Sequence, residues 1–147
     1  MPYELDISSN ADVERALGTC SEILTAGGVA ILPTDTVYSI GLLVSAHPDG
    51  ADSLFRIKQR PAAKKIPLLI PSIDALFEYG ASVDEDACAL AQAFWPGGLT
   101  LIAKASNKVP RAYQNLDGTV ALRVPGKSFA LELLGHMGEA MAVTAQM

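Results

Sequence analysis

The stretch Gly28-Val29-Ala30-Ile31-Leu32-Pro33-Thr34-Asp35-Thr36-Val37-Tyr38 places an apolar run directly before a cluster of small hydroxyl side chains and one carboxylate. Residues 29–32 predict a short, buried β-strand, because they are apolar and are bounded by glycines on one side and by Pro33 on the other. The hydroxyl groups then follow the carboxyl end of that strand, which is where ligands bind in open α/β sheets. An ordinary strand-end turn is the alternative interpretation, since Thr and Asp are common in turns.

A second polar cluster, Lys58-Gln59-Arg60-Pro61 with Lys64-Lys65, follows later in the chain. The apolar spacing of residues 49–58 predicts a helix that Pro61 cannot continue, so the cations gather where this helix ends. The helix dipole favours cations there, which is one explanation of the cluster. The functional explanation is that Arg and Lys side chains at a strand-end cleft hold phosphate or carboxylate oxygens. Charge alone does not decide between the two.

The rest of the chain alternates between helical and strand-like spacing of apolar residues, which predicts an α/β fold. Helices are predicted over residues 11–26, 49–58, 73–79, 84–94 and 128–137. Strands are predicted over residues 3–7, 29–32, 67–70, 99–104, 119–124 and 141–144. The chain has 147 residues, of which 50% are hydrophobic, and it shows no break in composition. We therefore predict a single domain over residues 1–147, with a twisted, mixed β-sheet flanked by helices.

Composition also disfavours several classes of protein. The net charge of −5 disfavours a protein that depends on an extended basic surface to bind nucleic acid. The apolar runs are too short for a membrane helix and residues 1–6 do not resemble a signal peptide, so we expect a cytoplasmic protein without a membrane partner. Cys20 and Cys88 stand apart from other Cys and His residues, so no metal site is predicted. Without a glycine-rich phosphate loop, side chains would have to hold any phosphate.

Four motifs in this order resemble the YrdC-like family of threonylcarbamoyl-adenylate synthases. They are Pro33-Thr34-Asp35-Thr36-Val37-Tyr38, Lys58-Gln59-Arg60-Pro61, Phe94-Trp95-Pro96-Gly97-Gly98-Leu99-Thr100 and Thr119-Val120-Ala121-Leu122-Arg123-Val124-Pro125. The resemblance implies condensation of L-threonine, bicarbonate and ATP into threonylcarbamoyl-AMP and pyrophosphate, as the first step of a tRNA modification. It implies Mg²⁺ bound with ATP as substrate, and tRNA or double-stranded RNA as a further partner, because some members are described as RNA-binding.

The resemblance also implies roles for particular residues. Lys58 matches a catalytic position. Thr36, Arg123 and Ala142 match the positions that bind threonine. Arg60, Lys64, Thr119 and Thr144 match the positions that bind ATP. For Arg123 a structural ion pair is the alternative, and for Asp35 a turn-capping role is as good an explanation as assistance in the reaction.

The C-terminal residues Ala142-Val143-Thr144-Ala145-Gln146-Met147 depart from the family pattern, which has Ser-x-Asn followed by a further segment. We therefore expect the domain to lack the usual C-terminal segment and to have weakened catalysis. Two classes of function stay open at this point. One is a nucleotidyltransferase, the L-threonylcarbamoyladenylate synthase, and the other is a non-catalytic, double-stranded RNA-binding or translation-associated protein.

Overall fold

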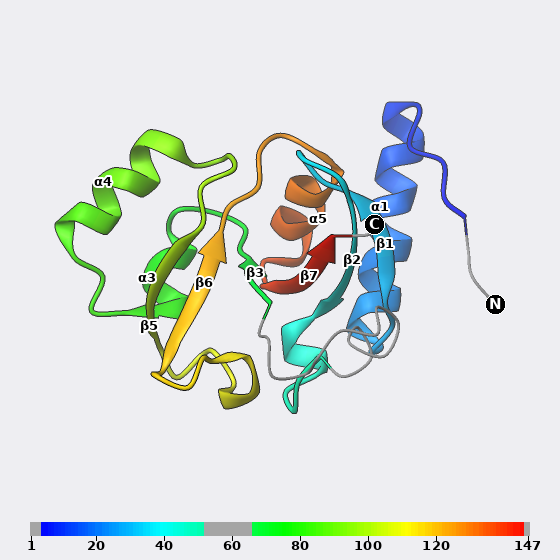
Figure 1. The fold of residues 1–147 in the computed structure, drawn as a ribbon. Coiled ribbons are helices and arrows are strands. Elements are labelled where there is room, and N and C mark those ends of the chain that lie inside the picture. The colour runs from blue at the N-terminus through cyan, green and yellow to red at the C-terminus, as the bar shows by residue number, and fades with distance from the viewer. Residues whose placement is uncertain (1–3, 52–65, 146–147) are drawn as a thin grey trace.

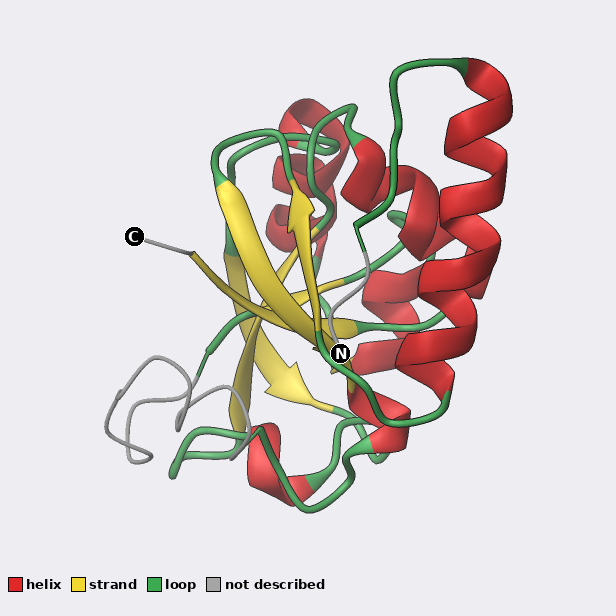
Figure 2. Ribbon diagram, turned by 90° about the vertical axis from the view of Figure 1, so that its right-hand side faces the viewer, coloured by secondary structure: helices red, strands yellow, loops and turns green. Residues whose placement is uncertain are grey.

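The computed structural model describes residues 4–51 and 66–145, which form a seven-stranded mixed β-sheet with helices packed against it (Figures 1 and 2). The helices in these residues are α1 (Asn10–Thr25), α3 (Ala75–Tyr79), α4 (Glu85–Phe94) and α5 (Phe129–Met137), with 3-10 turns at Val44–Ala46 and Arg111–Tyr113. The strands are β1 (Ala30–Pro33), β2 (Tyr38–Leu43), β3 (Leu68–Leu69), β4 (Gly80–Ala81), β5 (Leu101–Ala105), β6 (Thr119–Arg123) and β7 (Met141–Ala145). The predicted α/β class with a mixed sheet is confirmed.

The strands lie in the order β1-β2-β7-β3-β6-β5-β4. Every neighbouring pair is antiparallel except β3 and β6, which run parallel. Strand β7 pairs with β2 on one side and with β3 on the other, although it comes last of the seven in sequence. It therefore joins an N-terminal hairpin, β1-β2, to the half of the sheet that contains β6.

Each face of the sheet contributes to its own hydrophobic cluster. On β7, Met141 and Val143 pack with α1 and α5, whereas Ala142 belongs to the cluster that includes α3 and α4. In Figure 1, α3 and α4 lie beside β5 and β6 at one end of the molecule, and α1 and α5 lie beside β1 and β2 at the other. Val120 and Leu122 of β6 belong to the cluster of α3 and α4, whereas Thr119, Ala121 and Arg123 on the opposite face of β6 are only partly buried.

Capping residues define where the longer helices begin and end. The side chains of Ser9, Asp84 and Ser128 accept hydrogen bonds from the backbone N–H groups of the first turns of α1, α4 and α5. Each bond satisfies a donor that has no partner inside the helix. Helix α5 ends at Gly138, whose φ of 70° is the left-handed conformation that glycine adopts most readily. These boundaries agree closely with those expected for residues 84–94 and 128–137.

The strand predicted at residues 29–32 exists, but the prediction that it is buried was wrong. In the described residues β1 pairs only with β2 and lies at the edge of the sheet, where the side chain of Ile31 is 58% exposed. Strand β2 itself was not predicted, because Ser39 and Gly41 interrupt its apolar pattern. The hydroxyl cluster therefore occupies the turn of an antiparallel hairpin rather than the open end of a parallel strand.

Two further predictions have mixed outcomes. Residues 4–7 form no strand, and the helix predicted over residues 49–58 lies mostly outside the described residues. Strand β4 was also missed, because it is only two residues long.

Among the helices in the described ranges, none combines the length and apolar character needed to span a membrane.

Candidate functional site

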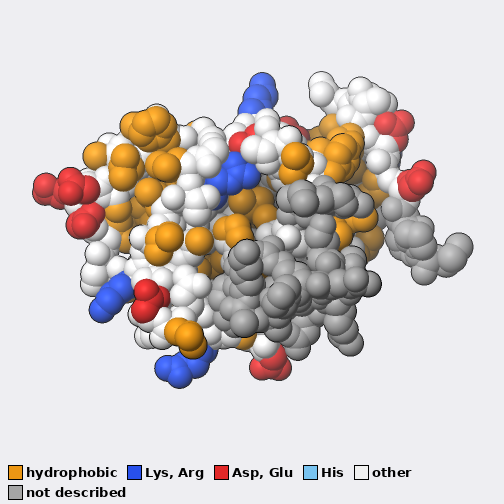
Figure 3. Space-filling view, in the orientation of Figure 1, with side chains coloured by type: hydrophobic (Ala, Val, Ile, Leu, Met, Phe, Trp, Pro, Cys, Tyr) orange, Lys and Arg blue, Asp and Glu red, His pale blue; other side chains and the backbone are white. Residues whose placement is uncertain are grey.

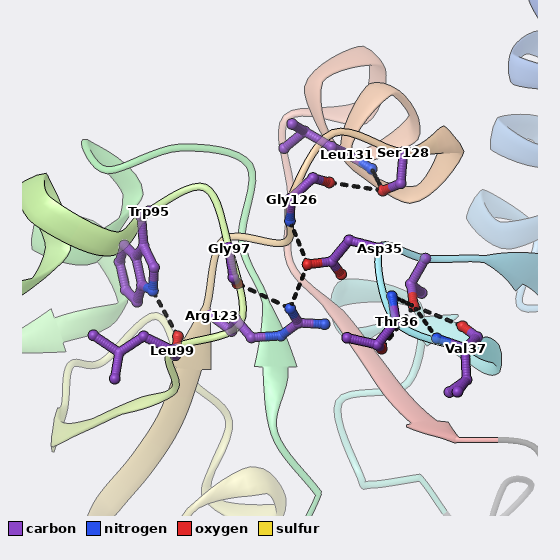
Figure 4. A network of polar contacts seen from close by, with 11 residues as sticks. Asp35, Thr36, Val37, Trp95, Gly97, Leu99, Arg123, Gly126, Ser128 and Leu131 are labelled. Atoms are coloured by element: carbon purple, nitrogen blue, oxygen red, sulfur yellow. Dashed lines mark hydrogen bonds and ion pairs between the residues drawn. The ribbon is translucent and has the colours of Figure 1, made fainter.

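The turn between β1 and β2 is organised by the hydroxyl group of Thr34. Thr34 Oγ1 donates to the carbonyl oxygen of Val37 at 2.6 Å, and it accepts from the backbone N–H groups of Thr36 and Val37 at 3.2 and 3.3 Å. The Thr36 hydroxyl lies 3.2 Å from the same atom. Thr34 therefore caps this turn, and the side chain of Asp35 points out of the turn toward β6 (Figure 4).

Asp35 reaches across to the end of β6 and forms an ion pair with Arg123. Its Oδ2 atom accepts from Arg123 Nη1 at 2.9 Å and from the backbone N–H of Gly126 at 2.8 Å. Arg123 Nη1 also donates to the carbonyl oxygen of Gly97 at 2.9 Å. Both charged side chains are mostly buried, with exposed fractions of 13% for Arg123 and 14% for Asp35. The turn-capping role considered for Asp35 is therefore wrong, since its carboxylate binds a different part of the chain.

Burial and pairing act on the pKa of Asp35 in opposite directions. Burial raises this pKa, but the hydrogen bonds from Arg123 and Gly126 and the charge of Arg123 together outweigh burial, so the pKa lies below its ordinary value. The other carboxylate oxygen, Oδ1, is buried and has no hydrogen-bond partner among the described residues. Leaving a buried acceptor unpaired costs free energy, so this carboxylate is not arranged for maximal stability.

The lowered pKa predicts how stability depends on pH. The folded state favours the charged Asp35, so its contribution is complete above the ordinary pKa of 3.8 and is lost as the pH falls through the lower pKa of the folded state. The unfolding free energy of the wild type should fall between about pH 5 and about pH 2, and that of Asp35→Asn should fall less over the same range. Urea unfolding of both proteins across this range measures the difference. Identical pH dependence in the two proteins would contradict the assignment.

Arg123 keeps part of its guanidinium group available. Nη1 makes both of the hydrogen bonds that the group forms within the described residues, which leaves Nε and Nη2 unpaired there. Asp35 Oδ1 is the only polar side-chain atom of the described residues that is both buried and unpaired. Since Nε and Nη2 of Arg123 are unpaired but are not such buried atoms, they retain contact with solvent. Figure 4 shows the guanidinium group pointing toward the turn that holds Thr36. Two parallel N–H groups in one plane are the arrangement that binds a carboxylate through both of its oxygens.

A second turn supplies the carbonyl oxygen that holds Arg123. The indole Nε1 of the buried Trp95 donates to the carbonyl oxygen of Leu99 at 2.7 Å, which closes the turn around Gly97. The backbone N–H of Gly97 donates to the carbonyl oxygen of Val124 at 2.9 Å. The third motif of the sequence therefore anchors the end of β6 from one side, while Asp35 anchors it from the other.

The open face of β6 extends away from Arg123. Thr119, Ala121 and Arg123 share this face, because alternate residues of a strand point the same way. Ile102 and Lys104 of β5 lie directly opposite Ala121 and Thr119, and both are exposed. Thr119 and Arg123 lie at opposite ends of β6, roughly 13 Å apart along the strand. A ligand that reached both would lie along this face of the sheet.

The Thr119 hydroxyl already has partners near its own end of the strand. It donates to Asp117 Oδ1 at 2.6 Å and accepts from Asn115 Nδ2 at 3.0 Å. The structure thus places Thr119 on the same face as Arg123 but does not bring the two side chains together.

The other predicted site residues lie in different surroundings. Ala142 is fully buried in the middle of β7, and Thr144 is 8% exposed and lies opposite Ile40 of β2. Lys58, Arg60 and Lys64 are outside the described residues, so their proposed roles stay predictions. Of the predicted threonine-binding residues, Thr36 follows Asp35 in the β1–β2 turn, and Arg123 pairs with Asp35, so both lie beside the same ion pair (Figure 4).

Surface charge on the described part of the molecule is dispersed. On the face shown in Figure 3, Lys and Arg side chains are separated by hydrophobic and acidic ones, and no continuous basic strip appears among the described residues. Hydrophobic side chains gather over α3, α4 and β5. The exposed large residues of these elements are Phe77, Leu90, Phe94 and Ile102.

Sequence patterns alone missed two parts of the site, the ion-pairing role of Asp35 and the contribution of Gly126. Asp35 was recognised as the one carboxylate of its motif, but its partner lies 88 residues away in sequence. Gly126 directly follows the last quoted motif. A glycine at that position next to a proline was the available signal for a close approach of the backbone.

The seven-stranded mixed sheet, with helices packed against it and the Asp35–Arg123 ion pair at the end of β6, defines an α/β domain. The chain belongs to the Sua5/YciO/YrdC family, whose model, described as "Telomere recombination", matches residues 22–147.

Two relatives illustrate the similarity. Threonylcarbamoyl-AMP synthase of Pyrococcus abyssi is 35% identical over 108 residues, covering 74% of this chain and 32% of that protein. YciO of Escherichia coli strain K12 is 32% identical over 135 residues, covering 91% of this chain and 65% of that protein. The chain thus spans from about a third to just under two thirds of the length of these relatives.

Solved structures support the same relationship. The crystal structure of P. abyssi Sua5 complexed with L-threonine superposes with a TM-score of 0.78 at 30% identity, covering 95% of this chain and 39% of that one. The crystal structure of E. coli YciO superposes with a TM-score of 0.79 at 31% identity, covering 89% of this chain and 63% of that one.

Proposed function

We propose that this chain binds L-threonine at the corner formed by Thr36 and Arg123, and that it takes part in the synthesis of threonylcarbamoyl-AMP. The observation that carries the proposal is the guanidinium group of Arg123, which is held through Nη1 while Nε and Nη2 have no partner among the described residues. The relative from P. abyssi is named threonylcarbamoyl-AMP synthase, and the Sua5 structure contains L-threonine. Neither feature favours the RNA-binding alternative.

In the proposed complex, the threonine carboxylate accepts two hydrogen bonds from Nε and Nη2 of Arg123. Thr36 lies beside it and offers a short hydroxyl group, which can donate to or accept from a polar group of the substrate at little entropic cost. Ala142 is buried, so any contribution it makes is to the shape of the pocket rather than to a polar contact.

The proposed reaction asks for positioning and charge neutralisation more than for covalent chemistry by the protein. The amino group of threonine and bicarbonate give a carbamate with loss of water. A carbamate oxygen then attacks the α-phosphorus of ATP, a new P–O bond forms, and the bond to pyrophosphate breaks. Holding the carbamate and the α-phosphorus in line supplies much of the rate enhancement in such a step.

ATP is proposed to lie along the open face of β6, between Arg123 and Thr119. Lys58, Arg60, Lys64 and Thr144 are the further residues proposed to contact it. In the described residues no group of three or more His, Cys, Asp or Glu side chains is arranged to hold a metal ion, and Asp35 is committed to Arg123. We therefore propose that Mg²⁺ enters bound to the phosphates of ATP, as it does in many nucleotide sites.

Titration calorimetry tests the threonine site directly. We expect the protein to bind L-threonine and to bind L-threoninamide, which lacks the carboxylate, about tenfold more weakly or worse. Thr36→Val keeps the shape of the side chain and removes the hydroxyl, so we expect it to weaken threonine binding by several-fold to about tenfold. Equal affinity for the acid and the amide would overturn the assignment of Arg123.

Pyrophosphate release tests the reaction separately from binding. The expected result is release from ATP that requires both L-threonine and bicarbonate. A short RNA duplex, titrated in the absence of the small ligands, provides the contrasting measurement. Tight RNA binding without any threonine binding would support the non-catalytic alternative instead.

A further inference from the structure

We propose that Asp35 is a positioning residue that sets the orientation of Arg123, and that Gly126 is required because Asp35 occupies the space of its missing side chain. This inference rests on the proposed threonine site. Asp35 and Gly126 do not contact the ligand in this proposal, but they determine how strongly the site prefers a ligand with a carboxylate.

The pairing of Asp35 with Arg123 is one-sided. Oδ2 accepts from both Arg123 and Gly126, whereas the buried Oδ1 accepts from no described residue. Arg–carboxylate pairs are frequently bidentate, with both carboxylate oxygens matched to two nitrogens of the guanidinium group. The one-sided arrangement instead leaves the Nε and Nη2 edge of Arg123 unoccupied, at a cost in stability.

Two acceptors on one nitrogen restrict how the guanidinium group can turn. Arg123 Nη1 is bound by Asp35 Oδ2 and by the carbonyl oxygen of Gly97, each at 2.9 Å. These acceptors belong to turns on either side of β6, so together they restrict the plane of the group. An arginine side chain that is already ordered loses less conformational entropy when its ligand binds.

The backbone at Gly126 approaches Asp35 so closely that a side chain there would have to displace Asp35. A Cβ atom at Gly126 would lie 2.9 Å from Asp35 Oδ2, 3.1 Å from its Cβ and 3.3 Å from its Cγ. Gly126 does not have a positive φ, so this contact, and not backbone conformation, explains the glycine. An added methyl group would displace the carboxylate without changing any charge in the site.

Gly126→Ala and Asp35→Asn test the proposal from two directions. Gly126→Ala keeps the charge of Asp35 and displaces its carboxylate. Asp35→Asn keeps the shape of the side chain and removes its charge. Gly98→Ala is the matched control, because a Cβ there meets nothing within 4 Å and the backbone φ is not positive. The dissociation constants of L-threonine and L-threoninamide are measured by calorimetry for each protein, with thermal unfolding as the check on folding.

We expect Gly126→Ala to weaken L-threonine binding about tenfold and L-threoninamide binding much less. The dissociation constant of L-threoninamide divided by that of L-threonine should therefore fall toward one. Asp35→Asn should shift the ratio in the same direction, and Gly98→Ala should leave it unchanged. General loosening of the structure would weaken both ligands equally and preserve the ratio.

The outcomes separate this inference from the proposed function. One outcome is that the wild type prefers L-threonine to L-threoninamide and that Asp35→Asn has the same ratio of dissociation constants. This outcome overturns the positioning role of Asp35 and leaves the threonine site intact. If Gly126→Ala does not fold, Asp35→Asn alone decides. A wild type that binds neither ligand overturns the proposed function and this inference with it.

Discussion

Replacing Arg123 by alanine is expected to eliminate measurable threonine binding and to destabilise the fold at the same time. The substitution removes two charge-assisted hydrogen bonds to the ligand, each contributing about 1.5 to 3 kcal/mol. It also leaves the buried Asp35 without its counter-ion, and breaking a buried ion pair from one side typically costs about 3 to 5 kcal/mol. Calorimetry with L-threonine and urea unfolding measure the two effects separately.

Because Arg123 pairs with the buried Asp35, Arg123→Ala changes stability as well as binding. Arg123→Lys retains the charge near Asp35 but not the fork of parallel N–H groups, so it should recover stability more than binding. The double variant Asp35→Ala/Arg123→Ala removes both charges, and it should be more stable than Arg123→Ala while binding threonine no better. Full threonine affinity in a folded Arg123→Ala protein would refute the site.

Trp95→Ala is expected to have the second largest effect, through the turn that carries Gly97. Trp95 is 5% exposed, and its indole donates to the carbonyl oxygen of Leu99. Truncation leaves a cavity and an unpaired carbonyl group, and buried Trp→Ala substitutions cost about 3 to 5 kcal/mol. Because the carbonyl oxygen of Gly97 holds Arg123, we expect threonine binding to weaken as well.

Trp95→Phe separates packing from hydrogen bonding. It keeps an aromatic ring in the core and removes only the indole N–H, so we expect a smaller loss of about 1 to 3 kcal/mol. Thermal and urea unfolding provide the comparison. An alanine variant as stable as the wild type would show that this turn does not depend on Trp95.

The longer helices and the strands β3, β5, β6 and β7 were predictable from sequence, whereas β2, the two-residue β4 and the edge position of β1 were not. Helix α4 begins beside Asp84 and α5 beside Ser128, both of which are local signals. Strand β2 contains Ser39 and Gly41, and it exists because β1 and β7 supply its hydrogen bonds. The edge position of β1 has the same origin, since the order of strands in a sheet is not encoded in any one segment.

The candidate site also contains residues that the sequence identifies and an arrangement of them that it does not. Thr36 and Arg123 could be nominated from motifs, because short hydroxyls and guanidinium groups have recognisable chemistry. The orientation of Arg123 could not, since it depends on Asp35 and on a backbone approach at Gly126 that only the folded sheet creates. A motif identifies the residue type, and the geometry of its neighbours decides which of its atoms remain available.

The central position of β7 has a consequence for biosynthesis. On the ribosome, β1 and β2 emerge first and β3 to β6 follow, but the strand that bridges them emerges after all of these. Until then β2 and β3 each present an unpaired edge, and such edges are prone to associate with other chains. Fragments that stop before Met141 should therefore aggregate during translation, and chaperones that shield strand edges should raise the yield of this protein.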